Sequence, residues 1–408
     1  MNFRQVEYNI RFWTSFIIVI IIFSFIHDFW NVEQQSLEQK NVDYTEVTGS
    51  TYYVLPKTSS NLNDTSPPDT HMSSNDTSQT ELSNIQVIPG GQSIGIQLET
   101  LGILVVGHHK ITQEQKMFSP AHEANIQVGD LILKIENEKI ESVEDIKPYI
   151  EQAGKNKAPL SLTLKRGEKI ITTSVLPVKD EEKNNYSIGL YIRDSAAGIG
   201  TLSFYEPKTK KYGALGHVIS DIDTKQPIPI HTGKIIHSEI TNIHKASRKN
   251  PGEKQAKFSI HDQALGTVNK NSPYGVFGIL EQLPKEDEMH KAMDVGFSKD
   301  VQEGPAKILT VVENEKVEEY DIEIVNNKIQ SNPSTKGMVI KVTDEKLIQQ
   351  TGGIIQGMSG SPIIQNDKII GAVTHVFVND PTTGYGVHIE WMLQEADILT
   401  QGSELKAS

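Results

Sequence analysis

The chain has 408 residues, and its 39 lysine and arginine residues against 52 aspartate and glutamate residues give a net charge of −13 at pH 7. This acidic balance argues against nucleic acid as the main partner, because phosphate binding needs clustered basic side chains. The sequence contains no cysteine, which excludes a thiol nucleophile, a disulfide framework and any cysteine-ligated metal site. At roughly 100–200 residues per domain, the length predicts two or three domains.

The first segment, residues 1–30, has the pattern of a membrane anchor. No charged residue lies between Arg11 and Asp28, and the apolar run is somewhat shorter than the roughly 20 residues of a usual spanning helix. Basic residues precede the run and acidic residues follow it, which places the N-terminus in the cytoplasm and the bulk outside. A cleaved signal peptide is the alternative. Residues 31–84, rich in Ser, Thr, Asn, Asp and Gln, are predicted to be a disordered tether.

Residues 85–180 are predicted to form a first folded unit. The alternation over residues 94–98 indicates a half-buried strand. Helical spacing from Ser142 to Ala153 predicts a helix that stops at Gly154. A closing hairpin follows over residues 160–178.

The order SPAHEANIQVGDLILKIENEKI, a helix and two strands resembles a PDZ domain of the bacterial protease-associated kind. The resemblance implies that the loop with Ser93, Ile94, Gly95 and Ile96 holds the C-terminal carboxylate of a peptide through backbone N–H groups. The peptide would then add as a strand beside residues 94–98. The alternative is a small β-domain with a closed groove that serves as a spacer.

Residues 185–400 are rich in short β-like runs separated by Gly and Pro, which predicts a sandwich or a barrel. The sharpest motif of this second unit is GMSGSP, residues 357–362. The flanking glycines let the backbone approach a substrate, and the N–H groups of Gly357 and Ser359 could point into one oxyanion hole. An ordinary Gly-Ser turn between strands is the alternative.

A serine nucleophile needs a general base, and the base needs an orienting acid. His217 follows a glycine and begins an apolar run, but spacing alone does not choose among the histidines or the acids. Asp344, close before Ser359, could equally cap a short helix that ends near Gly352. The histidine spacing places no metal ligands on one helical face, so no metal or other cofactor is expected. The other candidates are His231, His237, His244, His261, His375 and His388 as bases, and Asp221, Asp223, Asp262, Asp367 and Asp380 as acids.

The serine turn resembles that of trypsin-like serine proteases. The stretches YGALGHVISDIDT and TGGIIQGMSGSPIIQNDKIIGAVTHVFVNDPTTGYGVHIEWML, with the PDZ-like unit and the anchor, resemble the PDZ-containing sporulation signalling serine peptidases of endospore-forming bacteria. This resemblance implies a mainly β chain with a chymotrypsin-type β-barrel domain. It also implies His217 as general base, Asp344 as orienting acid and Ser359 as nucleophile. It disfavours Ser361, His375 and Asp380. In trypsin-like enzymes the acid usually lies much nearer the histidine in sequence.

The resemblance further implies an enzyme that is anchored in the spore-side inner membrane, with its bulk in the intermembrane space of the developing spore. It would cut itself near its N-terminus, within the tether or at the edge of the PDZ-like unit, because proteases engage exposed disordered chain. It would then cut a membrane-bound regulator of an intramembrane metalloprotease, so that a mother-cell sigma-factor precursor is processed. The alternatives are a non-catalytic PDZ scaffold and a membrane-anchored general quality-control serine protease.

Overall fold

The computed structural model describes residues 45–48, 85–258, 262–283, 291–313, 315–330 and 332–399. Of two compact units, the larger, Glu46–Phe258 with Asp262–Ser408, holds the described residues other than Thr45. The predicted anchor and most of the predicted tether lie outside the described residues, and β1 (Thr45–Thr48) is a short strand within the tether span. Across the described ranges, no helix is both long enough and apolar enough to cross a membrane.

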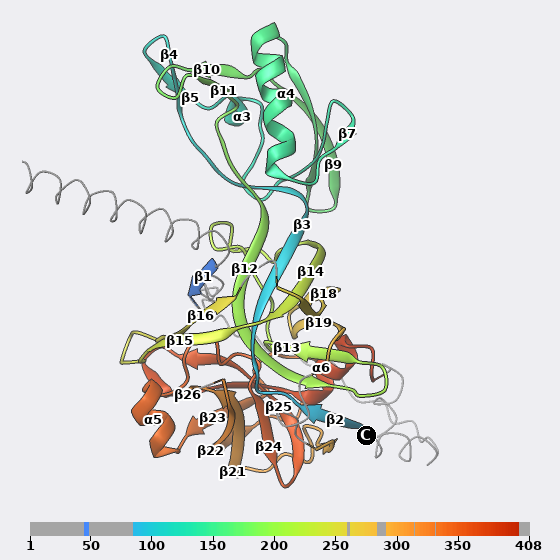
Figure 1. The fold of residues 1–408 in the computed structure, drawn as a ribbon, viewed down its shortest axis with the longest axis vertical. Helices are drawn as coiled ribbons and strands as arrows, with labels where there is room; N and C mark the ends of the chain where they lie inside the picture. Colours follow the sequence, from blue (N-terminus) through green and yellow to red (C-terminus); the bar gives the residue numbers. More distant parts are fainter. Residues whose placement is uncertain are drawn as a thin grey trace, which may run out of the picture. The chain divides into compact units, whose positions relative to one another are not determined.

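A first antiparallel barrel forms from six strands whose pairings close into a ring (Figure 1). The ring closes between β17 and β19 through a single bridge from Gly266 to Leu280. Its interior is an apolar cluster that includes Ile94, Ile96 and Leu202. In ring order, the strands are β3 (Ser93–His108), β12 (Leu190–Tyr205), β13 (Lys211–Ala214), β19 (Gly275–Ile279), β17 (Ala264–Thr267) and β14 (Ile230–His237).

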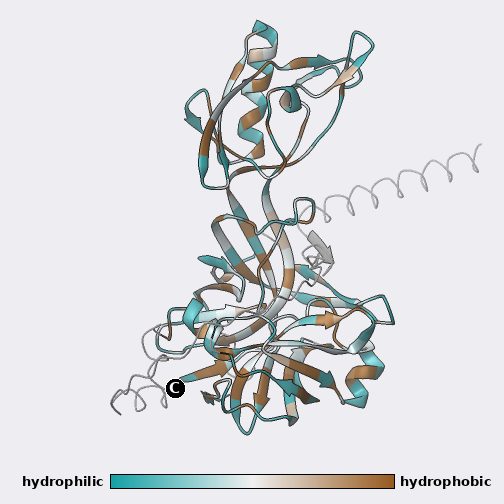
Figure 2. Cartoon of the chain, turned by 180° about the vertical axis from the view of Figure 1, so that it is seen from behind, coloured by the Kyte–Doolittle hydropathy of each residue, from teal (hydrophilic) through white to brown (hydrophobic). Residues whose placement is uncertain are grey.

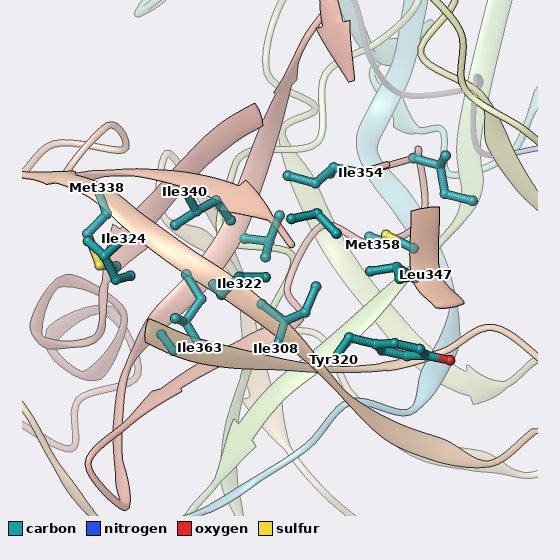
Figure 3. Close-up of a cluster of buried hydrophobic side chains, with 14 of the residues drawn as sticks. Ile308, Tyr320, Ile322, Ile324, Met338, Ile340, Leu347, Ile354, Met358 and Ile363 are labelled. Atoms are coloured by element: carbon teal, nitrogen blue, oxygen red, sulfur yellow. The ribbon is translucent and has the colours of Figure 1, made fainter. Parts of the chain in front are cut away.

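A second ring of six antiparallel strands closes entirely through regular pairings. Its core contains Ile308, Ile322, Ile340 and Ile363, as Figure 3 shows. In ring order, the strands are β21 (Gly304–Val311), β22 (Val317–Asn327), β23 (Met338–Val342), β26 (Asp380–His388), β25 (Lys368–Phe377) and β24 (Pro362–Gln365). Two six-stranded antiparallel barrels are the architecture expected for a chymotrypsin-type domain, and the prediction of a mainly β chain is confirmed.

Apolar side chains from both barrels meet in a third cluster, with α6 (Ile389–Glu395) packed against them. Val87 and Phe204 come from the side of the first barrel, and Ile369 and Val387 from the second. Figure 2 shows that the barrel strands carry both apolar residues, in brown, and polar residues, in teal. The remaining elements around the barrels are β2 (Gln86–Pro89), β15 (Glu239–His244), β16 (Glu253–Phe258), β18 (Lys270–Ser272), β20 (Met293–Val295) and α5 (Glu345–Thr351).

The PDZ unit is inserted in the chain between the barrel half of β3 and the barrel half of β12. These two long strands pair antiparallel, from Ser93 opposite Thr201 to His108 opposite Leu190. It has its own apolar core, built around Ile103, Ile132 and Leu162. Its other elements are β4 (Ile111–Gln113), β5 (Lys116–Phe118), α3 (Pro120–Glu123), β6 (Leu131–Ile135), β7 (Glu138–Lys139), α4 (Val143–Asn156), β8 (Leu160–Arg166), β9 (Lys169–Val175), β10 (Val178–Asp180) and β11 (Asn185–Ser187).

The predicted border between two consecutive domains therefore differs from the structure. β2 pairs with β12 and β20, and the first half of β3 pairs with β14, so residues 86–98 belong to the barrel rather than to the PDZ unit. The barrel is built from chain segments on both sides of the PDZ unit. The local strand pattern of residues 94–98 was predicted correctly, but their barrel partners lie more than a hundred residues away.

Helix α4 begins where the sequence predicts, but it does not end at the predicted stop, Gly154. The Ser142 hydroxyl accepts a hydrogen bond from the Asp145 N–H group, and the Asp145 carboxylate accepts one from the Ser142 N–H group, which forms a capping box. The helix runs through Gly154 to Asn156, and Lys157 in the left-handed conformation is its C-cap. A β-carbon at Gly154 would lie 2.2 Å from Tyr186 Cδ1. Gly154 therefore allows close packing and is not a stop signal.

Candidate active site

The serine turn follows α5, and Met358 anchors it in the core of the second barrel. Met358 is fully buried beside Leu347 and Ile354 (Figure 3). Gly357 and Gly360 have φ values of 92° and 94°, in the left-handed region that favours glycine. A β-carbon at Gly360 would lie 2.1 Å from the Thr201 carbonyl oxygen. The first barrel thus packs directly on the serine turn, and only glycine fits there.

The backbone N–H groups of the turn divide into two sets. Those of Met358, Gly360 and Ser361 donate to Ile355, Val373 and Met358, respectively. For the N–H groups of Gly357 and Ser359, no acceptor is present among the residues that the structure describes. Two such donors on one turn are what an oxyanion hole requires. The predicted oxyanion pair is thus positioned as donors without internal partners.

Thr201 of β12 fixes this turn from the first barrel. Its N–H group donates to the Ser359 carbonyl oxygen at 3.0 Å, and its hydroxyl donates to the Gly357 carbonyl oxygen at 2.8 Å. Thr201 is fully buried, so both hydrogen bonds are shielded from water. No local sequence signal marks this residue, because its partners lie more than 150 residues along the chain.

His217 follows β13 in a turn where Leu215 and Gly216 both have positive φ values. Its Nδ1 lies 2.9 Å from the Val218 carbonyl oxygen. Because a carbonyl oxygen can only accept, Nδ1 carries the proton and the lone pair lies on Nε2. This is the tautomer that a general base needs. Burial, together with the neighbouring His375 imidazole, lowers the pKa of His217 to about 3.

Strand β25 joins the candidate base and the candidate nucleophile. The Ser359 hydroxyl donates to the Thr374 carbonyl oxygen at 2.9 Å. A β-carbon at Gly216, next to His217, would lie 3.0 Å from Thr374 Cγ2. The rings of His217 and His375 have centroids 5.2 Å apart. The structure therefore brings Ser359 and the turn of His217 to adjacent residues of β25, Thr374 and His375. It adds His375, which the sequence disfavoured as catalytic and which adjoins the candidate base here.

Asp344 lies elsewhere in this conformation. Its carboxylate accepts from the Leu347 N–H group at 2.8 Å, and it caps α5, which ends at Thr351 with Gly352 as its C-cap. This is the helix-capping alternative noted from the sequence. Within the described ranges, no carboxylate is among the groups that shift the pKa of His217. The role of Asp344 as orienting acid thus stays a prediction.

Other candidates of the sequence analysis have partners of their own. Asp221 and Asp223 both pair with Arg193. Asp380 accepts from the hydroxyls of Thr382 and Thr383, and His388 lies against the Lys328 carbonyl oxygen. His237 and His244 face Glu315 and Glu253 on the surface. His261 lies outside the described residues.

The predicted peptide-binding loop has no free strand edge in this structure. Ser93, Ile94, Gly95 and Ile96 lie in the first barrel, where β12 pairs along one edge and β14 along the other. A peptide cannot add to a strand that already has two neighbours. The same long strand β3 serves both units, and its first half pairs within the barrel.

Buried Lys254 is a further residue that sequence analysis missed. It lies on β16, and a β-carbon at Gly357 would be 3.1–3.2 Å from three carbons of its side chain. Its ammonium group donates to the Thr310 hydroxyl at 2.9 Å, and no carboxylate pairs with it among the described residues. Burial lowers the pKa of Lys254 to about 7. An uncompensated buried lysine thus packs against the oxyanion turn.

Comparison with protein families matches residues 184–393, just over half of the chain, to the SpoIVB peptidase S55 family. The chain belongs to this family. Residues 93–176 match the PDZ family. Membership confirms the predicted class, a serine endopeptidase, and both matches confirm the suspected resemblance.

Relatives in other groups match only parts of the chain. A Clostridium perfringens protein described as a zinc metalloprotease is 36% identical over 72 residues, 18% of this chain and 21% of its own length. The chain thus spans about a fifth of that relative. The PDZ domain of an SdrC-like protein from Listeria monocytogenes is 20% identical, with a TM-score of 0.18, over 22% of this chain and 87% of that one. An M. tuberculosis protease in its active form is 14% identical, with a TM-score of 0.30, over 49% and 74%.

Proposed function

We propose that the chain is a signalling serine endopeptidase, with Ser359 as nucleophile and His217 as general base. One observation carries the proposal. The N–H groups of Gly357 and Ser359 have no internal acceptor in the described structure, and the Ser359 hydroxyl bonds Thr374, whose neighbour in the chain, His375, adjoins His217. A non-catalytic scaffold has no need of such a turn.

The reaction would proceed through an acyl-enzyme. The Ser359 hydroxyl leaves the Thr374 carbonyl oxygen and gives its proton to His217 Nε2, while its oxygen forms a bond to the scissile carbonyl carbon. The Gly357 and Ser359 N–H groups bind the resulting oxyanion. The proton then passes to the leaving amine as the peptide bond breaks, and water releases the acyl group by the same steps.

In the present conformation the pKa of His217 is about 3. Such an imidazole is neutral at physiological pH, but it is a weak base. A nearby carboxylate would raise its pKa. We therefore place the activated state in a conformation where an acid, Asp344 by family resemblance, approaches His217.

The proposed biological setting rests on family membership and on the sequence of residues 1–84. The chain would be anchored by residues 12–26 in the spore-side inner membrane and would face the intermembrane space. It would first cut itself N-terminal to the barrels. It would then cut a membrane-bound regulator of an intramembrane metalloprotease, so that a mother-cell sigma-factor precursor is processed.

A mass-spectrometric time course on the full chain tests the activity. We expect discrete fragments from the wild type and none from Ser359→Ala, with Ser361→Ala as matched control because that serine is two residues away on the same turn. Intact wild type, also in the presence of a membrane-bound substrate, would favour the scaffold. Many cuts in an unfolded test protein would favour a quality-control protease over a signalling one.

A further inference from the structure

The PDZ end of strand β3 is already paired on both edges. At the PDZ end of β3, Ile103 and Leu104 pair with β6 on one edge. On the other edge, residues 190–193 of β12 run antiparallel to Leu104–His108. PDZ domains bind extended peptides by adding a strand to a free sheet edge. Here a segment of the chain itself takes that place.

Side chains of this segment pack in the apolar core that also contains residues of β3 and α4. Ile188 and Leu190 are buried, and Ile192 packs in the same apolar core as Ile146 and Ile150 of α4. These three residues alternate along the chain, as in a peptide that lays one face into a groove.

The segment ends in a carboxylate at the start of the helix. Asp194 Oδ2 accepts from the N–H group of Val143, the first residue of α4, at 2.8 Å. Helix N-termini stabilise negative charge. The Asp194 carbonyl oxygen accepts from the Thr100 hydroxyl at 2.9 Å, next to the turn at Gly102, which has a φ of 91°. A negatively charged group therefore lies where the strand meets a loop and a helix start.

We infer that residues 188–194 are an internal ligand of the PDZ unit. They compete for its groove with extended peptides that carry aliphatic side chains at alternate positions and a carboxylate at the end. The PDZ unit is thus closed in the present conformation and opens by release of its own strand.

The same strand reaches both parts of the candidate active site. Arg193, inside the internal ligand, pairs with Asp221 and Asp223 in the loop that follows His217. Eight residues further along β12, Thr201 holds the Gly357 and Ser359 carbonyl oxygens. Release of residues 188–194 therefore frees the loop after His217 and loosens the strand that fixes the oxyanion turn. This consequence for catalysis rests on the proposed function, whereas competition for the groove does not.

Peptide binding tests the internal ligand. The probe is a fluorescein-labelled peptide of residues 186–194, YSIGLYIRD, with a free C-terminal carboxylate, added to the full chain carrying Ser359→Ala. Ile192→Thr removes a core contact of the internal segment, so we expect the peptide to bind at least ten times more tightly than to the parent. Tyr191→Thr is the matched control, because Tyr191 is the next residue on the same strand and is 57% exposed. Its affinity should equal that of the parent.

A second variant keeps the test valid if Ile192→Thr does not fold. Asp194→Asn keeps the shape of the side chain and removes the charge at the helix start, and it too should tighten peptide binding. Equal affinity in the parent and in both variants would overturn the internal ligand.

Hydrogen exchange tests the connection to the site without any readout of activity. Saturating peptide should raise the exchange of amides in residues 190–201, 217–224 and 357–361 at least severalfold. Peptide binding that leaves residues 217–224 and 357–361 unchanged would overturn the connection. Since neither measurement needs catalysis, failure of the proposed peptidase activity would remain distinguishable from failure of this inference.

Discussion

Thr201 joins the two barrels at the oxyanion turn, and this makes its hydroxyl a positioning group. Thr201→Val keeps the side-chain shape and leaves the buried Gly357 carbonyl oxygen without its hydroxyl donor. A buried group left unpaired costs about 1–3 kcal/mol. Loss of one oxyanion donor itself lowers kcat about 10²–10³-fold. Because Thr201→Val disturbs only the position of these donors, we expect a smaller fall in kcat, about tenfold, with little change in KM.

Thr201→Ser provides the control, because it keeps the hydroxyl and should restore most of kcat. Steady-state kinetics on a tether peptide, with thermal unfolding of each variant, measure both effects. A rise in KM at constant kcat would contradict a positioning role and point to substrate binding.

Lys254 makes the stability of the chain depend on pH. Its pKa is about 7 in the folded state and 10.5 ordinarily, so between these values the unfolded chain binds more protons and stability rises with pH. Below pH 7 the cost of the buried charge is fully present. We expect Lys254→Met to raise the unfolding free energy by about 2 kcal/mol at pH 6, and the gain to shrink as the pH approaches 10.

Urea unfolding at pH 6 and pH 9 measures this difference. Lys257→Met, an exposed lysine on the same strand, should be neutral at both values. A loss of stability in Lys254→Met at both pH values would show that a partner compensates the charge.

Asp344 combines a role that the structure shows with one that it does not. Asparagine caps a helix as well as aspartate does, whereas alanine loses about 1 kcal/mol. We therefore expect Asp344→Asn to unfold like the wild type and Asp344→Ala to be less stable by about that amount. A stable Asp344→Asn variant with kcat reduced by about 10⁴ would assign the carboxylate to the triad, and one with normal kcat would limit it to the cap.

The sequence predicts site residues when their signal is local. The glycines around Ser359 mark a turn and made this serine a candidate. The glycine before His217 made it one candidate among several histidines, and the family resemblance chose it. Thr201, His375 and Lys254 carry no local signal, because their roles arise from partners brought near by barrel closure. The family resemblance led to the prediction of Asp344 as the orienting acid. The position of Asp344 before a helix led to the prediction that it caps that helix.

Among the elements, short-range patterns predicted hairpins well. The turn at residues 166–168 joins β8 and β9, which is the closing hairpin predicted over residues 160–178. Helix α4 shows the limit of such patterns. Glycine usually ends a helix, but Gly154 lies inside α4 because Tyr186, 32 residues later, packs against it. The position where α4 ends therefore depends on a tertiary contact that local propensity does not reveal.

At the scale of the whole molecule, the insertion of the PDZ unit was beyond the sequence patterns. A strand of 16 residues looks the same whether one unit uses it or two, so β3 was assigned to a single domain. Composition changes mark the tether, but no change marks the point where β3 leaves the barrel. Consecutive domains were the simplest hypothesis, and ring closure through β3 and β14 contradicts it.

This topology predicts which fragments fold. A fragment that starts at residue 185 lacks β2 and β3, so the first barrel loses the strand between β12 and β14 and exposes its apolar core. We expect residues 185–408 to be unfolded or aggregated by circular dichroism and thermal melting, whereas residues 85–408 should melt cooperatively. A cooperative transition in the shorter fragment would contradict the insertion.

The same topology restricts where self-cleavage can occur without loss of the enzyme. Cuts N-terminal to Gln86 leave both barrels complete, because β2 is the first strand that either barrel pairs with. A cut between β3 and β12 would leave the first barrel in two pieces, held only by strand pairing. We therefore expect the termini of stable, active fragments to fall before residue 86, which narrows the predicted cleavage region to the tether. N-terminal sequencing of fragments that retain activity measures this, and an active fragment that begins within residues 99–185 would contradict it.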